Sequence, residues 1–224
     1  ERMNAQVRGN TVAIRNSNDA ISLSQTAEGA IGKVGDMLQR MRELAVQSAN
    51  ASNSASDRTN LNAEYQQLND EVTRVLTGTK FNGVDLLNTA ASLSFQVGAN
   101  NVTTDQIAVS TTVLTTGTGV AAVTAGDITS DTTALAAMDD LDDAIDEITT
   151  ARATFGAVQN RFDAVISNLQ VASENQAASR GRIMDADFAT ETSNLSRGQI
   201  LQQAGTAMVA QANQLPQGVL SLLR

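Results

Sequence analysis

The amino-acid sequence predicts a mainly α fold: an elongated antiparallel helical bundle or coiled coil with a β-hairpin region, plus a C-terminal helix. Three observations support this. Several long stretches repeat apolar residues in alternating steps of three and four, the spacing of a coiled-coil seam. One short stretch instead alternates apolar and polar residues, as strands do. The hydrophobic residues, 42% of the chain, include only 3% aromatics, and such small side chains suit thin helix–helix seams.

Residues 1 to about 47 are predicted to form one long helix, which at 1.5 Å per residue would extend roughly 70 Å. Upstream positions keep the same spacing, with two polar residues between the apolar ones. A stretch rich in Ser, Asn and Ala, 48–56, then predicts a loop. The seam residues are Ala27, Ile31, Val34, Leu38, Met41 and Ala45, preceded by Met3, Val7, Ile14 and Ile21 with Asn10 and Ser17 between them.

A second helix is predicted from about Asp57 to Thr77, with Gly78 where a C-terminal cap belongs. Residues 80–88 are predicted to form a turn. The seam of this second helix consists of Leu61, Tyr65, Leu68, Val72 and Val75.

From Ser92 onward the period changes to two, and Gly98–Asn101 separates two alternating runs, which predicts a β-hairpin. The following residues, 110–133, are rich in Thr, Gly and Ala and show no heptad. They are predicted to be exposed strand and loop. The alternating apolar residues of the hairpin are Leu93, Phe95 and Val97, then Ile107 and Val109.

The third helix has the clearest pattern, with apolar residues seven apart from Leu141 to Leu169. Arg152 and Gln159 take polar positions of this seam, where they could fix the register. The pattern returns in the last segment, which divides the chain into two predicted domains: a helical rod over 1–187, interrupted at about 92–133, and a C-terminal helix over 188–224. The heptad residues are Leu141, Ile148, Phe155, Phe162 and Leu169, then Leu201, Met208, Leu215 and Leu222.

Composition excludes many functions. The chain has no Cys, His or Trp, which rules out disulfides, Cys/His zinc sites, Ser-His-Asp triads and HExxH proteases. A net charge of −9 argues against a nucleic-acid-binding groove. We therefore expect no enzyme, cofactor or metal.

The charge is unevenly distributed, since ten acids and no Lys or Arg lie between Lys80 and Arg152. The group from Asp139 to Glu147 is interpreted as acids in the first turns of a helix, where they complement the helix dipole.

The last segment indicates assembly. Residues 198–223 carry no charge, and their apolar seam has no evident partner in this chain, although a lone helix of this kind is marginal in water. Many glutamines on this segment argue against membrane insertion. The chain begins without Met in what is predicted to be helix, and its first residues, Glu1 to Asn10, are polar and contain no apolar signal-peptide segment. We expect a longer N-terminal segment in the native protein.

Several long motifs occur along the chain: the block Leu38–Asn50, the block Thr79–Gly83 followed by Phe95–Asn100, and the C-terminal blocks Gly156–Phe162 and Ala212–Arg224. Together, and in this order, they resemble bacterial flagellin over nearly the whole chain except about 102–133. The resemblance implies that 188–224 is an inner-core helix and that about 92–133 contains a short variable region.

The resemblance implies an extracellular subunit that self-assembles into the flagellar filament for motility, after type III export without a cleaved signal peptide. It implies a homopolymer, with a flagellar secretion chaperone binding the C-terminal helix. Burial in the assembly, or chaperone contact, is expected at Leu201, Met208, Leu215 and Leu222. A flagellin-sensing Toll-like receptor is a further implied partner. Its main contact residues by motif position are Arg40, Leu44 and Glu64, which are expected to be exposed, with Gln39, Glu43 and Gln47 nearby.

Two other proteins share parts of this pattern. A hook–filament junction protein has the same architecture, but the hairpin motif and the block around Arg40 argue against it. A coiled-coil signalling rod would lack the β-rich interruption at 92–133. The Thr-rich stretch 103–133 leaves open whether the exposed region is O-glycosylated.

Overall fold

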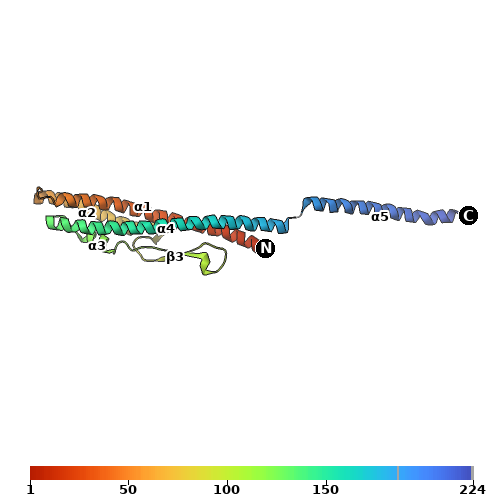
Figure 1. Cartoon of the computed structure of the whole chain (residues 1–224), viewed down its shortest axis with the longest axis horizontal. Helices are drawn as coiled ribbons and strands as arrows, with labels where there is room; N and C mark the ends of the chain where they lie inside the picture. The colour runs from red at the N-terminus through yellow and green to blue at the C-terminus, as the bar shows by residue number, and fades with distance from the viewer. Residues whose placement is uncertain (186, 223–224) are drawn as a thin grey trace. The chain divides into compact units, whose positions relative to one another are not determined.

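The computed structural model describes residues 1–185 and 187–222, with side chains described through residue 212. It divides into two compact units, Glu1–Gln176 and Ala177–Arg224. The helices are α1 (Arg2–Ser48), α2 (Ala55–Gly78), α3 (Thr118–Ala125), α4 (Asp131–Met184) and α5 (Phe188–Leu222). In the first unit, α1, α2 and the N-terminal part of α4 lie side by side (Figure 1). The predicted mainly α bundle with a hairpin is confirmed.

The apolar seam of α1 forms the centre of the core. Every predicted seam residue from Ala27 to Ala45 is fully buried, and burial of each Leu, Ile or Met contributes roughly 1.5–3 kcal/mol. Upstream the seam is looser, because Met3 is exposed while Ile14 and Ile21 are half-buried. Asn10 and Ser17, the predicted polar positions, are buried there.

The ends of α2 are set by the side chains of Ser54 and Asp57 at its start and of Thr79 at its end. At the start, the Ser54 Oγ accepts a hydrogen bond from the Asp57 N–H (3.2 Å), and the Asp57 carboxylate accepts one from the Ser54 N–H (3.0 Å), which forms a capping box. Hydrogen bonds from the Ser54 hydroxyl and N–H hold the pKa of Asp57 below its ordinary value. The prediction of Gly78 as C-terminal cap is wrong. Thr79 caps the helix in an extended conformation, and its N–H and hydroxyl both bind the Val75 carbonyl, so the left-handed conformation of glycine is not needed.

Ion pairs and hydrogen bonds fix α1 and α4 in antiparallel register. Arg42 donates to both carboxylate oxygens of Asp142 (2.6 and 3.0 Å). Fourteen residues earlier on α1, Glu28 accepts a hydrogen bond from Gln159 (2.7 Å) and lies 3.9 Å from the Arg152 guanidinium. The two polar seam residues predicted to fix the register therefore meet one carboxylate on α1.

Two small antiparallel hairpins follow α2. Strands β1 (Lys80–Phe81) and β2 (Val84–Asp85) form the first, and the predicted turn at 80–88 contains their connection. Asn82 and Gly83 join them with positive φ (49° and 83°), as the connection of a type I′ hairpin requires.

The second hairpin is the predicted one and packs on the helices. Strands β3 (Ser92–Gln96) and β4 (Gln106–Ser110) pair in it, with Phe95 opposite Ile107. The Phe95 ring meets Phe162 of α4 edge to face, with centroids 5.8 Å apart. The Asn16 amide of α1 donates to the Gln96 carbonyl (3.0 Å).

The prediction of exposed strand and loop for 110–133 is wrong. This stretch contains the short helix α3 and contributes fully or almost fully buried residues to the core, namely Leu114, Val120, Val123 and Ile128. Three side chains one turn apart on α2 bind the backbone of this stretch, each at 3.0 Å. Asn62 accepts a hydrogen bond from the Ile128 N–H. Gln66 donates to the Gly126 carbonyl, and Asn69 donates to the Thr124 carbonyl. The α2 amides were not identified from the sequence.

Gly119 allows α3 to approach α4 closely. A Cβ at this position would clash with the backbone of Asp143 and Ala144, which no side-chain adjustment can relieve. We expect Gly119→Ala to destabilise the first unit by about 1–3 kcal/mol, the usual cost of overpacking. Urea unfolding would measure this, and Gly156→Ala, which meets nothing within 4 Å, is the matched control. Equal stability of the two variants would contradict the close packing of α3.

Candidate functional site

The residues predicted to contact the receptor lie on α1 and α2, and the structure divides them. Gln39, Arg40, Glu43 and Gln47 are exposed on α1, and Glu64 is exposed on α2. Leu44 is only 1% exposed, so the expectation that it lies on the surface is wrong. Because α1 packs against more than one helix, its apolar stripe is wider than a two-residue seam and includes Leu44.

Arg40 is the centre of an exposed ion-pair network. Its Nε and one terminal nitrogen donate to the Glu64 Oε1 (3.0 and 2.9 Å), and its other terminal nitrogen donates to Glu43 (2.8 Å). These two carboxylates raise the pKa of Arg40 above its ordinary value. The side chains of Arg40 and Glu64 are 50% and 47% exposed, so the network joins α1 to α2 and remains open to a partner.

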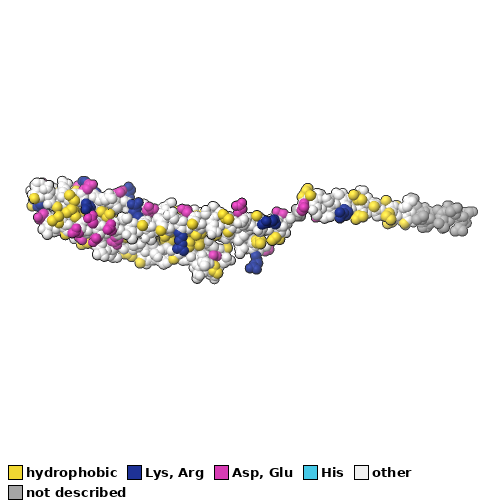
Figure 2. Space-filling model, in the orientation of Figure 1, with side chains coloured by type: hydrophobic (Ala, Val, Ile, Leu, Met, Phe, Trp, Pro, Cys, Tyr) yellow, Lys and Arg dark blue, Asp and Glu magenta, His cyan; other side chains and the backbone are white. Residues whose placement is uncertain are grey.

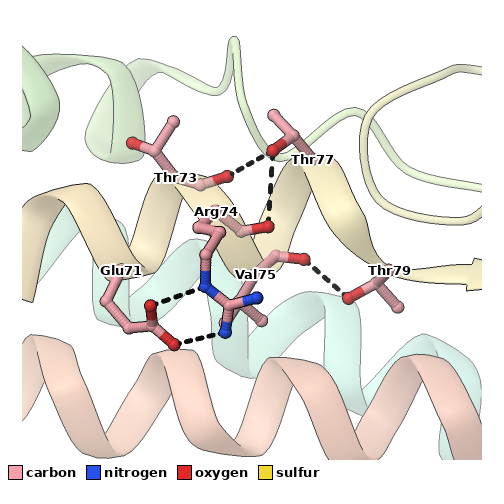
Figure 3. A network of polar contacts seen from close by, with 6 residues as sticks. All are labelled: Glu71, Thr73, Arg74, Val75, Thr77 and Thr79. Carbon is pink, nitrogen blue, oxygen red and sulfur yellow. Dashed lines mark hydrogen bonds and ion pairs between the residues drawn. The ribbon is translucent and has the colours of Figure 1, made fainter.

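A second exposed arginine shows what a purely local network looks like. Arg74 on α2 pairs with Glu71 one turn earlier at 2.7 and 2.6 Å, among hydroxyl-to-carbonyl bonds of the last helical turns (Figure 3). Arg74 therefore has the same chemistry as Arg40 but joins no second helix, which makes it a matched control position.

Arg42, two residues after Arg40, points to a different side of α1 and connects this helix to α4. Its two hydrogen bonds lower the pKa of Asp142. This stabilising contribution is fully present above the ordinary Asp pKa of about 3.9 and is lost as the pH falls through the lowered value. A shallow hollow on the surface of α1 is lined by Gln39, Arg42, Glu43, Val46 and Gln47. Most of the predicted contact residues on α1 therefore surround one depression.

The acidic stretch does not lie where the sequence interpretation placed it. Since α4 begins at Asp131, the group from Asp139 to Glu147 starts in the third turn, and the helix dipole does not explain it. Within the described residues, no group of three or more acidic side chains is arranged to hold a metal ion. None of the described helices is long and apolar enough to cross a membrane.

The predicted assembly residues of α5 are exposed where they are described. The exposed fractions of Leu201 and Met208 are 65% and 73%. The side chains of Leu215 and Leu222 lie outside the described residues. In the described part of this unit the other large apolar side chains are also exposed (Figure 2).

Comparison with known proteins gives a consistent result. Residues 1–92 match the family model of the bacterial flagellin N-terminal helical region, and residues 138–223 match that of the C-terminal helical region. The chain is 47% identical to a flagellin of Halalkalibacterium halodurans over 228 aligned positions, covering 100% of this chain and 82% of the relative.

Solved structures are similar as well. A crystal structure of Bacillus cereus flagellin matches with a TM-score of 0.63 at 33% identity, covering 74% of this chain and 94% of the other. A putative flagellar hook-associated protein from Vibrio parahaemolyticus matches with a TM-score of 0.61 over 78% of this chain and 92% of the other, but at 14% identity this shows a shared fold alone. The fold thus occurs in both kinds of protein, whereas the sequence identity lies with flagellins.

Proposed function

The chain belongs to the bacterial flagellin family and is a structural subunit of the flagellar filament, and on this premise we propose how its two units serve assembly. The unit Glu1–Gln176 makes the contacts between neighbouring subunits. Helix α5 is buried among other copies in the inner core of the filament, outside the cell.

One observation supports the role of α5 above all. Its large apolar side chains with described positions are each more than 60% exposed, namely Phe188, Leu195, Ile200, Leu201, Met208 and Val209. Exposed apolar surface of this extent marks an interaction site. A face without charge also suits packing among identical copies, where repeated charges would repel. Before export, the same face is available to a flagellar secretion chaperone.

Oxidation of methionine tests this burial directly. We expect hydrogen peroxide to oxidise Met208 readily in the monomer and about tenfold more slowly in filaments, because burial shields the thioether. Met41, which is fully buried in the monomer, serves as the internal control and should react slowly in both states. Mass spectrometry of the digested protein measures both rates. Equal oxidation of Met208 in monomer and filament would contradict the proposed burial.

We further propose that a flagellin-sensing Toll-like receptor binds the Arg40 network. The support is an exposed arginine held by two carboxylates on neighbouring helices, with Gln39 and Gln47 beside it. Leu44, which is buried, does not contact the receptor in this proposal. Its packing in the core holds the exposed residues of α1 in position.

Arg40→Ala should reduce receptor activation about tenfold, since arginines at the centre of an interface often dominate binding. The measurement is dose-dependent reporter signalling in cells that express the receptor. Arg74→Ala removes a more exposed arginine with a local partner and should leave the dose response unchanged. A similar loss for both variants would show that the effect is not specific to this network.

A further inference from the structure

One exposed face of α1 carries positive charge without a partner. Arg8, Val12 and Arg15 are spaced by four and three residues and therefore lie on the same side of the helix. All three are exposed, with Val12 at 44%. Among the described residues, neither arginine forms an ion pair or a side-chain hydrogen bond, and Asp19, one turn beyond Arg15, does not reach it.

An exposed face of α4 carries the opposite charge. Asp139, Asp143 and Asp146 are exposed at spacings of four and three, and they form no ion pair among the described residues. Leu135, one turn earlier, is 54% exposed. Acidic side chains gather at the end of the first unit where α4 begins (Figure 2).

These two faces cannot meet within one chain. The Arg42–Asp142 pair places the acidic face beside the C-terminal part of α1. Arg15 lies 27 residues before Arg42, which corresponds to roughly 40 Å along the helix. Charges this far apart are screened at physiological salt, where the Debye length is about 8 Å. Any partner of either face would therefore be another molecule.

The two faces match in spacing as well as in charge. Arg8 and Arg15 are seven residues apart, as are Asp139 and Asp146, and both separations correspond to roughly 10.5 Å. Helix α4 runs antiparallel to α1 within one chain, so α4 of a second copy that points in the same direction also runs antiparallel to α1 of the first. The two arginines of one copy can then face the two aspartates of the other in order. A shift of about 45 Å along the bundle brings Arg8 opposite Asp146 and Arg15 opposite Asp139.

We propose that the Arg8–Val12–Arg15 face of one copy binds the Asp139–Asp143–Asp146 face of a second copy. This inference rests on the filament function. The interface is heterologous, since two different faces of the same chain meet, and a contact of this kind propagates into an open helical assembly. Exposed pairs contribute little individually, so the main effects are on the rate and the register of subunit addition.

Charge reversal tests the pairing. The variants are Arg8→Glu with Arg15→Glu, Asp139→Arg with Asp146→Arg, and the chain that carries all four changes. Each double reversal places like charges opposite each other and should slow elongation of filament seeds about tenfold or more. The fourfold variant restores opposite charges and should elongate within about threefold of the wild type. Circular dichroism confirms that each variant is folded.

The control for the acidic face is Asp70→Arg with Asp163→Arg, which makes the same change in net charge as Asp139→Arg with Asp146→Arg at exposed positions outside both faces. It should elongate like the wild type. If either double reversal behaves like this control, or if the fourfold variant stays slow, the pairing is wrong. Loss in only one double reversal would assign that face to a different partner and would also overturn the pairing. If the wild type itself fails to elongate seeds, the filament function fails instead, and this inference with it.

Discussion

Met208→Asp should abolish elongation of filament seeds while leaving the monomer folded. Met208 is 73% exposed in the monomer, so a carboxylate there remains hydrated and costs little. Burial in the filament would strip that carboxylate of water without supplying a partner, because residues 198–223 carry no Lys or Arg. Several kcal/mol per subunit correspond to at least about a hundredfold loss of affinity for the filament end. Sedimentation after seeding measures the loss.

Met208→Leu is the control, since it keeps the apolar character and nearly the volume of the side chain. It should elongate seeds like the wild type. Unchanged helix content and unfolding midpoint of both variants would show that only assembly differs. Normal filaments from Met208→Asp would contradict the proposed burial of α5.

The second large effect concerns the stability of the first unit. Phe162 is fully buried on α4 and meets Phe95 of the hairpin edge to face. Phe162→Ala would leave a cavity and detach β3 from the helix, and we expect a loss of about 3–5 kcal/mol in the free energy of unfolding. Val171→Ala, on the same helix but 59% exposed, should change the stability by less than about 0.5 kcal/mol.

The chain contains its own reporter for this measurement. Tyr65 is the only tyrosine, there is no tryptophan, and its side chain is buried in the core of the first unit. Burial, with Asp140 and Asp127 nearby, raises the pKa of Tyr65 to about 12, so the phenol stays neutral throughout the neutral pH range. Its fluorescence in a urea titration therefore follows the first unit without interference from α5. Equal midpoints for Phe162→Ala and Val171→Ala would contradict the described packing.

Long periodic segments were predictable because their pattern repeats many times. The seam from Ala27 to Ala45 and the heptads from Leu141 to Phe162 name residues that the structure buries. The β3–β4 hairpin was equally clear, since two alternating runs enclose a turn-forming stretch. In each case the local pattern and the tertiary packing agree.

The α3 region was not predictable in the same way. Its eight residues are all Thr, Gly, Ala or Val, too few for a periodic signal, and only the three alanines are strong helix formers. Distant residues hold it in place: the amides of Gln66 and Asn69 and the close approach that Gly119 allows to α4. Such contacts connect parts of the chain more than twenty residues apart, and a local pattern does not contain them.

The candidate contact face was predicted in part. Its motif identified Arg40 and Glu64, and the structure adds that they bind each other across two helices. The exposure of Leu44 was predicted wrongly because a motif match gives the position of a residue without its burial. The unpaired charges at Arg8, Arg15 and the acidic face of α4 emerged only when the register of α1 and α4 was known.

Seeded elongation of the wild-type protein tests the central claim most directly. Short filament fragments are mixed with purified protein, and their lengths are followed by electron microscopy. A filament subunit adds repeatedly, so we expect the mean length to grow in proportion to the protein supplied. A hook–filament junction protein would bind the ends and stop there. Fragments that bind the protein but do not lengthen, or that bind none, would contradict the assignment as a filament subunit.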